Sequence, residues 1–151
     1  TVATVAEVLS LPTSIPLVAC LPEIAISTRD ARGVVPPDVS ITDLVETVGA
    51  ASTLALGMAA ADVALVGEGM SDPVVTPARA ALITGYTSVE SAAYDAGAAG
   101  VTVSGAGPAV LAVCPRDKRQ SVAAAMVRAF DAAGIDARAY QTAVGPGAML
   151  Y

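Results

Sequence analysis

Short apolar runs alternate with longer amphipathic stretches along this chain, and turn or cap residues separate them. Residues 17–21 form an apolar run that Pro22 closes, and residues 100–114 hold two β-branched runs around a turn, so strands are predicted in both segments. Residues 1–5 and 135–144 alternate between apolar and polar side chains, which also predicts strands. With the helices below, the predicted order is strand, strand, helix, helix, helix, strand, strand, helix, strand.

Two helices are predicted before the chain centre. Ser40 with Asp43 three residues later resembles a capping box. Apolar and small residues repeat behind it at helical spacing, and these are Leu44, Val48, Ala51, Ala55 and Met58. The small residues predict close packing. Residues 62–70 predict a shorter helix, after which Pro73 and Pro77 predict a break.

Two further helices flank the glycine-containing turn. Thr87 and Glu90 resemble a second capping box, with a buried stripe of Val89, Ala93 and Ala96 behind them and Gly97 as the terminating residue. Asp117 begins the last helix, which Gly134 ends, and its apolar face is formed by Val122, Met126, Phe130 and Ala133.

The second half of this order, helix, strand, turn, strand, helix, strand, is typical of a split βαβ unit. We therefore predict an α+β domain of the ferredoxin-like kind, with an antiparallel sheet covered by helices on one face. This fold alone does not specify a function.

The turn Gly105-Ala106-Gly107-Pro108 is the most informative segment. Glycine tolerates positive φ and leaves the backbone open, so the turn can present N–H donors to an anion. From the spacing alone, an ordinary tight connection between two buried strands is the favoured interpretation. The glycine pattern of dinucleotide-binding folds and the P-loop pattern are both absent.

Charge and composition exclude several classes of function. The net charge of -6, with only 8 Lys and Arg, argues against a nucleic-acid partner. An acidic, Ala- and Val-rich chain is also typical of salt-adapted proteins. The uncharged run at residues 47–61 is too short for a membrane span and predicts a buried helix.

The chain contains no His and two Cys, which argues against a zinc site and excludes a histidine base within this sequence. Cys20 and Cys114 lie in apolar runs and are predicted to be buried, reduced thiols of a cytoplasmic protein. The mean hydropathy of +0.65 predicts apolar surface that a partner covers. Together with the missing initiator Met, this suggests one lobe of a longer protein.

A polar segment, residues 27–32, follows the strand at 17–21, in a position where binding residues often lie. A simpler interpretation makes Arg32 a surface charge paired with Asp30 or Glu23. A planar guanidinium can also bind a carboxylate through two parallel hydrogen bonds.

Three motifs carry a family resemblance. Val101-Thr-Val-Ser-Gly-Ala-Gly-Pro108, preceded by Tyr94-Asp-Ala-Gly-Ala-Ala-Gly100, resembles the C-terminal glycine motif of the GHMP small-molecule kinases. Leu21-Pro-Glu-Ile-Ala-Ile-Ser-Thr-Arg-Asp-Ala-Arg32 and Pro77-Ala-Arg-Ala-Ala-Leu-Ile-Thr-Gly-Tyr86 narrow the resemblance to the homoserine kinases.

The resemblance implies ATP-dependent phosphorylation of L-homoserine to O-phospho-L-homoserine, in threonine biosynthesis. It implies that residues 1–37 continue from an N-terminal kinase domain and that residues 38–151 form the GHMP kinase C-terminal domain. ATP and Mg²⁺ would be bound mainly by the N-terminal half, whose glycine- and serine-rich loop is absent from this sequence. Family members are often homodimers.

The family positions that bind substrate correspond to Thr28, Arg32, Arg79 and Gly105, and the glycine-motif loop to Ser104, Gly105, Ala106 and Gly107. Arg29 keeps the surface-charge interpretation. The sequence departs from the family at Val75 and Ala78, where a His and a Tyr are usual, so part of the polar lining of the pocket differs. No catalytic residue is assigned, because Asp30, Asp72 and Asp95 are equally conceivable bases.

Two alternatives remain open. Another GHMP kinase, of the mevalonate or archaeal shikimate type, would carry the same glycine turn. A ferredoxin-like module that senses an amino acid without catalysis would share the fold but not the kinase half.

Overall fold

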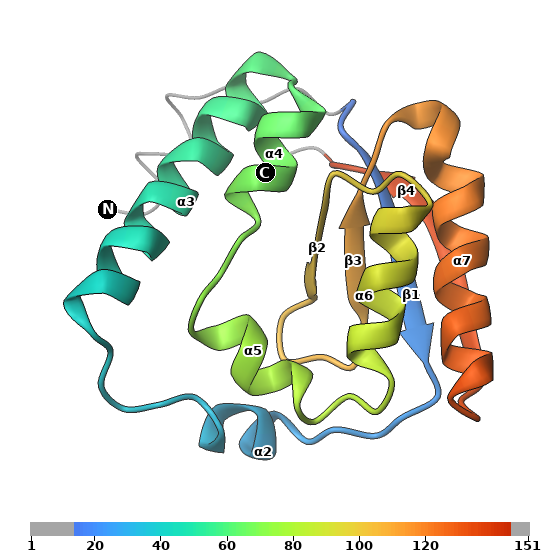
Figure 1. The fold of residues 1–151 in the computed structure, drawn as a ribbon, viewed down its shortest axis with the longest axis horizontal. Coiled ribbons are helices and arrows are strands. Elements are labelled where there is room, and N and C mark those ends of the chain that lie inside the picture. The colour runs from blue at the N-terminus through green and yellow to red at the C-terminus, as the bar shows by residue number, and fades with distance from the viewer. Residues whose placement is uncertain (1–13, 146–151) are drawn as a thin grey trace, which may run out of the picture.

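The computed structural model describes residues 14–145, in which four strands form one antiparallel sheet (Figure 1). The strands are β1 (Pro16–Pro22), β2 (Gly100–Val103), β3 (Val110–Val113) and β4 (Ala137–Ala143), in the order β2-β3-β1-β4. β1 lies inside the sheet and pairs antiparallel with β3 on one side and β4 on the other. The strand predicted at residues 1–5 lies outside the described residues.

The connections confirm the predicted fold class. The chain leaves β1, passes through several helices and returns as β2 on the far side of β3, while β3 connects through α7 (Arg119–Ala132) to β4 on the far side of β1. Two interleaved crossovers of this kind define the split βαβ arrangement. The domain is therefore α+β, with the ferredoxin-like strand order.

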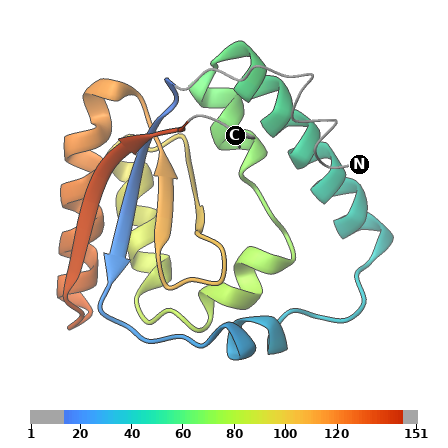
Figure 2. The same cartoon turned by 180° about the vertical axis from the view of Figure 1, so that it is seen from behind.

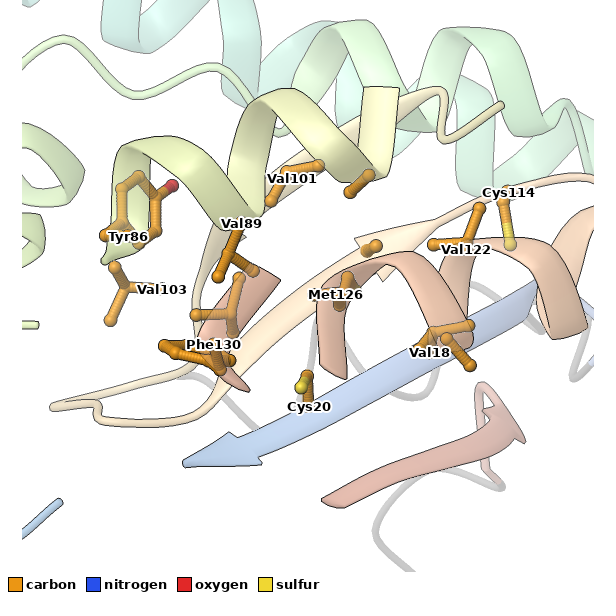
Figure 3. Packing of buried hydrophobic residues seen from close by; sticks show 14 of the residues in the cluster. Val18, Cys20, Tyr86, Val89, Val101, Val103, Cys114, Val122, Met126 and Phe130 are labelled. Atoms are coloured by element: carbon orange, nitrogen blue, oxygen red, sulfur yellow. The ribbon is translucent and has the colours of Figure 1, made fainter. Parts of the chain in front are cut away.

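Helices α6 (Tyr86–Asp95) and α7 cover one face of the sheet, α7 being preceded by a short 3₁₀ turn at Arg116–Lys118 (Figure 1). On the opposite face, seen from behind, no described helix crosses the middle of the sheet (Figure 2). At one end of that face, α3 (Ile41–Ala60) and α4 (Val63–Gly69) pack against the sheet through a second buried cluster that includes Val66 and Val113. The core between helices and sheet follows from strand alternation, because every second residue of β1 points towards the helices. Val18 and Cys20 meet Val89, Met126 and Phe130 there, and all five are fully buried (Figure 3).

Both cysteines are buried and free, as the sequence predicts. Burial raises the pKa of the Cys20 thiol to about 11 and raises that of Cys114 as well. Both side chains therefore act as small apolar groups in the core.

Helices α3 (Ile41–Ala60) and α4 (Val63–Gly69) form a hairpin beside the free edge of β2. The predicted capping box at the start of α3 is present, with Ser40 and Asp43 bonding each other's backbone N–H groups. Small residues permit the close packing that the sequence predicts. A Cβ on Gly57 would lie 2.6 Å from the Val66 nitrogen, and one on Gly67 would overlap the Ala99 carbonyl.

The prediction that residues 47–61 form a buried helix is wrong about burial. Only Gly57 of α3 is buried, while Ile41 is 77% exposed, Leu56 67% and Val45 65%. α3 packs chiefly against α4, so an apolar stripe of the helix faces away from the described residues. No helix among residues 14–145 is both long enough and apolar enough to cross a membrane.

The second predicted capping box is also wrong. α6 begins at Tyr86, and the residue before it, Gly85, has a φ of +84° and no side chain that could cap the helix. Thr87 therefore lies inside the first turn instead of at the cap position. Gly97 ends the helix region with a φ of +104°, as the sequence predicts.

Pro77 does not interrupt helical structure as predicted. It lies in the first turn of a short helix, α5 (Val75–Ala80). Proline is tolerated there, since the first-turn N–H groups have no partner within the helix. Another short helix, α2 (Thr28–Gly33), was not predicted. Its cap is Ser27, whose hydroxyl accepts a hydrogen bond from the Asp30 N–H at 3.0 Å.

The close contact of α4 with the sheet predicts opposite effects for two glycine substitutions. Gly67→Ala should lower the free energy of unfolding by about 1 to 3 kcal/mol, because the added methyl group overlaps Ala99 backbone. Gly49→Ala in α3 is the matched control. A Cβ there meets nothing within 4 Å, so it should stabilise the helix by about 0.5 to 1 kcal/mol. Urea unfolding of both variants tests this, and equal effects would contradict the packing described.

Candidate functional site

Helix α2, helix α5 and the β2–β3 loop are joined through Arg79. The Arg79 Nη1 group donates to the Gly105 carbonyl at 2.7 Å, and its Nε group donates to the Ala31 carbonyl at 3.3 Å. Two of the four residues predicted to bind substrate, Arg79 and Gly105, are thus in direct contact. The remaining guanidinium N–H groups of Arg79 make no hydrogen bond within residues 14–145.

Thr28 and Arg32 lie on α2, next to the carbonyl that Arg79 binds. They are four residues apart in a helix, which places both side chains on the same side of α2. Both are exposed. The structure gives no contact between either side chain and Arg79, so their convergence on one substrate remains a prediction.

The acids that could neutralise Arg32 have other partners. The Asp30 carboxylate accepts the Ser27 hydroxyl at 2.6 Å, and Glu23 pairs with Arg138 at 3.9 Å. Within the described part of the chain Arg32 has no ion pair. The structure therefore does not support the interpretation that Arg32 is paired with Asp30 or Glu23.

The glycine loop is a tight turn with one open side. Gly105 has a φ of +56° and Gly107 a φ of +81°, and the Gly107 N–H closes the turn on the Ser104 carbonyl at 3.0 Å. A Cβ on Gly105 would meet nothing within 4 Å, so that side of the loop is open. The N–H groups of Gly105 and Ala106 have no backbone partner within residues 14–145 and can receive an anion.

A network that the sequence did not indicate lies at the other end of α5. The Asp72 carboxylate accepts the N–H groups of Val74, Val75 and Thr76, each at 2.9 Å, and the Thr76 hydroxyl at 3.2 Å. Burial alone would raise the pKa of Asp72, but these hydrogen bonds together lower it. With four donors on its carboxylate, Asp72 is a poor candidate for a catalytic base.

A groove of about 1000 Å³ lies between α5, α6 and the chain after α4, and Arg79 is not part of its lining. Its polar lining includes Glu68, Asp72 and Glu90, and it contains none of the four residues predicted to bind substrate. Tyr86 at its wall donates to Glu90 at 3.2 Å, and burial together with the Glu90 charge raises the pKa of Tyr86. The arginine site thus consists of polar groups on an open surface, outside this groove.

No group of three or more His, Cys, Asp or Glu within residues 14–145 could hold a metal ion.

Comparison with known proteins gives a family match. The family model described as "GHMP kinases C terminal" matches residues 54–132. The chain is 67% identical over 137 residues to a homoserine kinase of Halorubrum lacusprofundi, covering 91% of the chain and 47% of that protein. It is 59% identical over its full length to a homoserine kinase of Haloquadratum walsbyi, covering 52% of that protein.

Solved structures agree. The crystal structure of homoserine kinase from Cytophaga hutchinsonii has a TM-score of 0.84 at 34% identity, covering 90% of this chain and 44% of that one. Mevalonate kinase of L. major, solved with R-mevalonate, has a TM-score of 0.62 at 15% identity over 93% of this chain and 46% of that one, which shows a shared fold only. The chain spans about half the length of the curated relatives it matches.

The backbone at the glycine loop predicts the effect of adding a methyl group. Gly105→Ala should lower the free energy of unfolding by about 1 to 2 kcal/mol, because alanine disfavours positive φ. Gly134→Ala, after α7, is the matched control, with a φ of +77° and also nothing within 4 Å of an added Cβ. Thermal unfolding should show similar losses for both. A much larger loss at Gly105 would mean that the loop is more closely packed than described.

Proposed function

The chain belongs to the GHMP kinase family as the C-terminal region of a homoserine kinase homologue, and we propose that it forms the substrate-side lobe of an active homoserine kinase. The whole protein would transfer the γ-phosphoryl group of ATP to the side-chain hydroxyl of L-homoserine. The products are O-phospho-L-homoserine and ADP.

The contact of Arg79 with the glycine loop is the observation that carries this proposal. Homoserine has a carboxylate besides its reacting hydroxyl, and binding the carboxylate fixes the orientation of the whole molecule. Arg79 is held by two backbone carbonyls and still has N–H groups to offer. We assign the carboxylate to Arg79 and Arg32, with Thr28 and the Gly105 backbone bordering the same site.

The reaction asks little covalent chemistry of the protein. The homoserine oxygen attacks the γ-phosphorus of ATP, the bond to the bridging oxygen of ADP breaks, and the hydroxyl proton is released. Catalysis in such transfers is mainly positioning and charge stabilisation, and this lobe offers arginines and backbone amides for that purpose. We place the main binding site of ATP and Mg²⁺ in the other half of the protein, and we assign no catalytic base.

The exposed stripe of α3 supports a second lobe. Ile41, Val45 and Leu56 are each more than 60% exposed, which is unusual for large apolar side chains that face water together. We propose that an N-terminal kinase domain packs on this side and that residues 1–37 lead from it into the lobe. Free, buried thiols are in keeping with a reducing cytoplasm.

Activity of the isolated lobe tests this division of labour. A coupled assay with ATP and homoserine should show turnover with the full-length protein and none with residues 1–151 alone, because the ATP loop is absent from this segment. A panel including mevalonate and shikimate identifies the substrate. Comparable turnover by the lobe alone would refute the placement of the ATP site, and preference for another alcohol would refute homoserine.

Removing either arginine should weaken homoserine binding. In the full-length protein, Arg79→Ala and Arg32→Ala should each raise the homoserine KM and cost about 2 to 4 kcal/mol in transition-state binding, roughly 30- to 700-fold in kcat/KM. The KM for ATP should stay nearly unchanged. Arg29→Ala is the matched control on α2 and should leave homoserine kinetics as they are. Normal homoserine kinetics in both Arg32 and Arg79 variants would disprove the assignment.

A further inference from the structure

Two hydrogen-bonded links join α5 to β2 and the glycine loop. The first joins the hydroxyl oxygens of Thr76 and Thr102 at 2.9 Å, and the second joins Arg79 to the Gly105 carbonyl at 2.7 Å. Thr76 and Arg79 are three residues apart on one side of these links, and Thr102 and Gly105 are three residues apart on the other. Residues three apart lie on the same side of a helix, so one side of α5 faces β2 and the loop.

The direction of the hydrogen bonds ties the first link to Asp72. A threonine hydroxyl has a single proton, and that of Thr76 is donated to the Asp72 carboxylate at 3.2 Å. The Thr102 hydroxyl must therefore donate to Thr76. The chain of donors runs from β2 through Thr76 to Asp72, and all three side chains are partly buried.

Asp72 in turn fixes the start of α5. The first residue outside the helix, Val74, has no side chain that could cap it, and Asp72 instead accepts the N–H groups of Val74, Val75 and Thr76. α5 has only 6 residues and no fully buried side chain, and Ala80 is its one residue packed against the main core among the described residues. Its polar contacts therefore contribute to fixing its position.

We propose that Asp72 and Thr76 are positioning residues for substrate binding, which act through Arg79 by fixing α5 against β2. This inference rests on the proposed function, in which Arg79 binds the substrate carboxylate. A guanidinium that forms two parallel hydrogen bonds must be aimed correctly, so a small shift of α5 weakens substrate binding without touching the substrate.

Kinetics of the full-length protein test the proposal. Thr76→Val removes the hydroxyl and keeps the side-chain shape, and it should raise the homoserine KM about 3- to 10-fold while the ATP KM stays within about twofold. Thr76→Ser keeps the hydroxyl and should restore the homoserine KM. Asp72→Asn, which leaves one acceptor oxygen, should raise it in the same way.

The matched control is Asp62→Asn. Asp62 caps α4 by accepting hydrogen bonds from the N–H groups of Ala64 and Leu65, and its carboxylate bonds neither α5 nor β2. This variant keeps one acceptor oxygen and loses only the charge at the helix start, so it should lower the melting temperature slightly while the homoserine KM stays unchanged. If Asp62→Asn and Asp72→Asn raise the homoserine KM equally, the effect is general destabilisation and the proposal is wrong.

A double variant shows whether Thr76 acts through Arg79. In an Arg79→Ala background, Thr76→Val should add little to the homoserine KM, since the group that it positions is gone. Additive effects would overturn the proposal. If Arg79→Ala raises the homoserine KM and Thr76→Val does not, the positioning role alone fails. If neither variant changes it, the assignment of Arg79 as a ligand fails and the positioning role fails with it.

Discussion

The arrangement of this lobe depends on how closely α4 approaches the edge strand β2. A Cβ on Gly100 would lie 2.6 Å from the Gly67 Cα, so the helix and the strand are in backbone contact and larger residues cannot be accommodated without a shift. β2 thereby gains a neighbour on its free edge. The chain therefore leaves α4 beside this strand. Asp72 and then α5 follow within a few residues.

The consequence is that the substrate-side groups are assembled from distant parts of the chain through backbone atoms. Arg79 binds the carbonyl of Ala31, which lies 48 residues before it, and the carbonyl of Gly105, which lies 26 residues after it. Backbone carbonyls are fixed by the secondary structure around them, so they hold an arginine more rigidly than flexible surface acids do. The glycine loop thus has two roles. The Gly105 carbonyl holds Arg79, and the N–H groups of Gly105 and Ala106, which have no backbone partner among the described residues, remain available to a ligand.

The sequence predicted most of the fold because local signals agree with it. Residues such as Ser40, Gly97 and Gly134 marked ends of helices, and the alternation in β1 marked the core face. The prediction failed where several conformations fit the same residues. Thr87 and Glu90 fit a capping box, but the helix begins earlier, directly after Gly85. Pro77 was interpreted as a helix breaker, although the first turn of a helix tolerates proline.

The candidate site was only partly predictable. Motif resemblance assigned Arg79 and Gly105 to one site, and the structure shows a hydrogen bond between them, but substrate binding by these two residues and by Thr28 and Arg32 remains a prediction. The bond between Thr76 and Thr102 could not be found from spacing, because it joins a helix to a strand across 26 residues. The exposure of α3 was missed for a different reason: a pattern of apolar residues identifies a face of a helix but not what lies against it.

That exposure bears on how the lobe opens in solution. A helix packed along one side, chiefly on α4, can detach without disturbing the sheet, so its amide protons should exchange with solvent long before those of β1, which has strands on both sides. Helix α3 and the four-stranded sheet are then separate units of local unfolding, while α4 stays with the sheet. A partner that covers the outer side of α3 would make α3 and the sheet unfold as one unit. The added stability would reach β2, which leads into the glycine loop, through the Gly67–Gly100 contact.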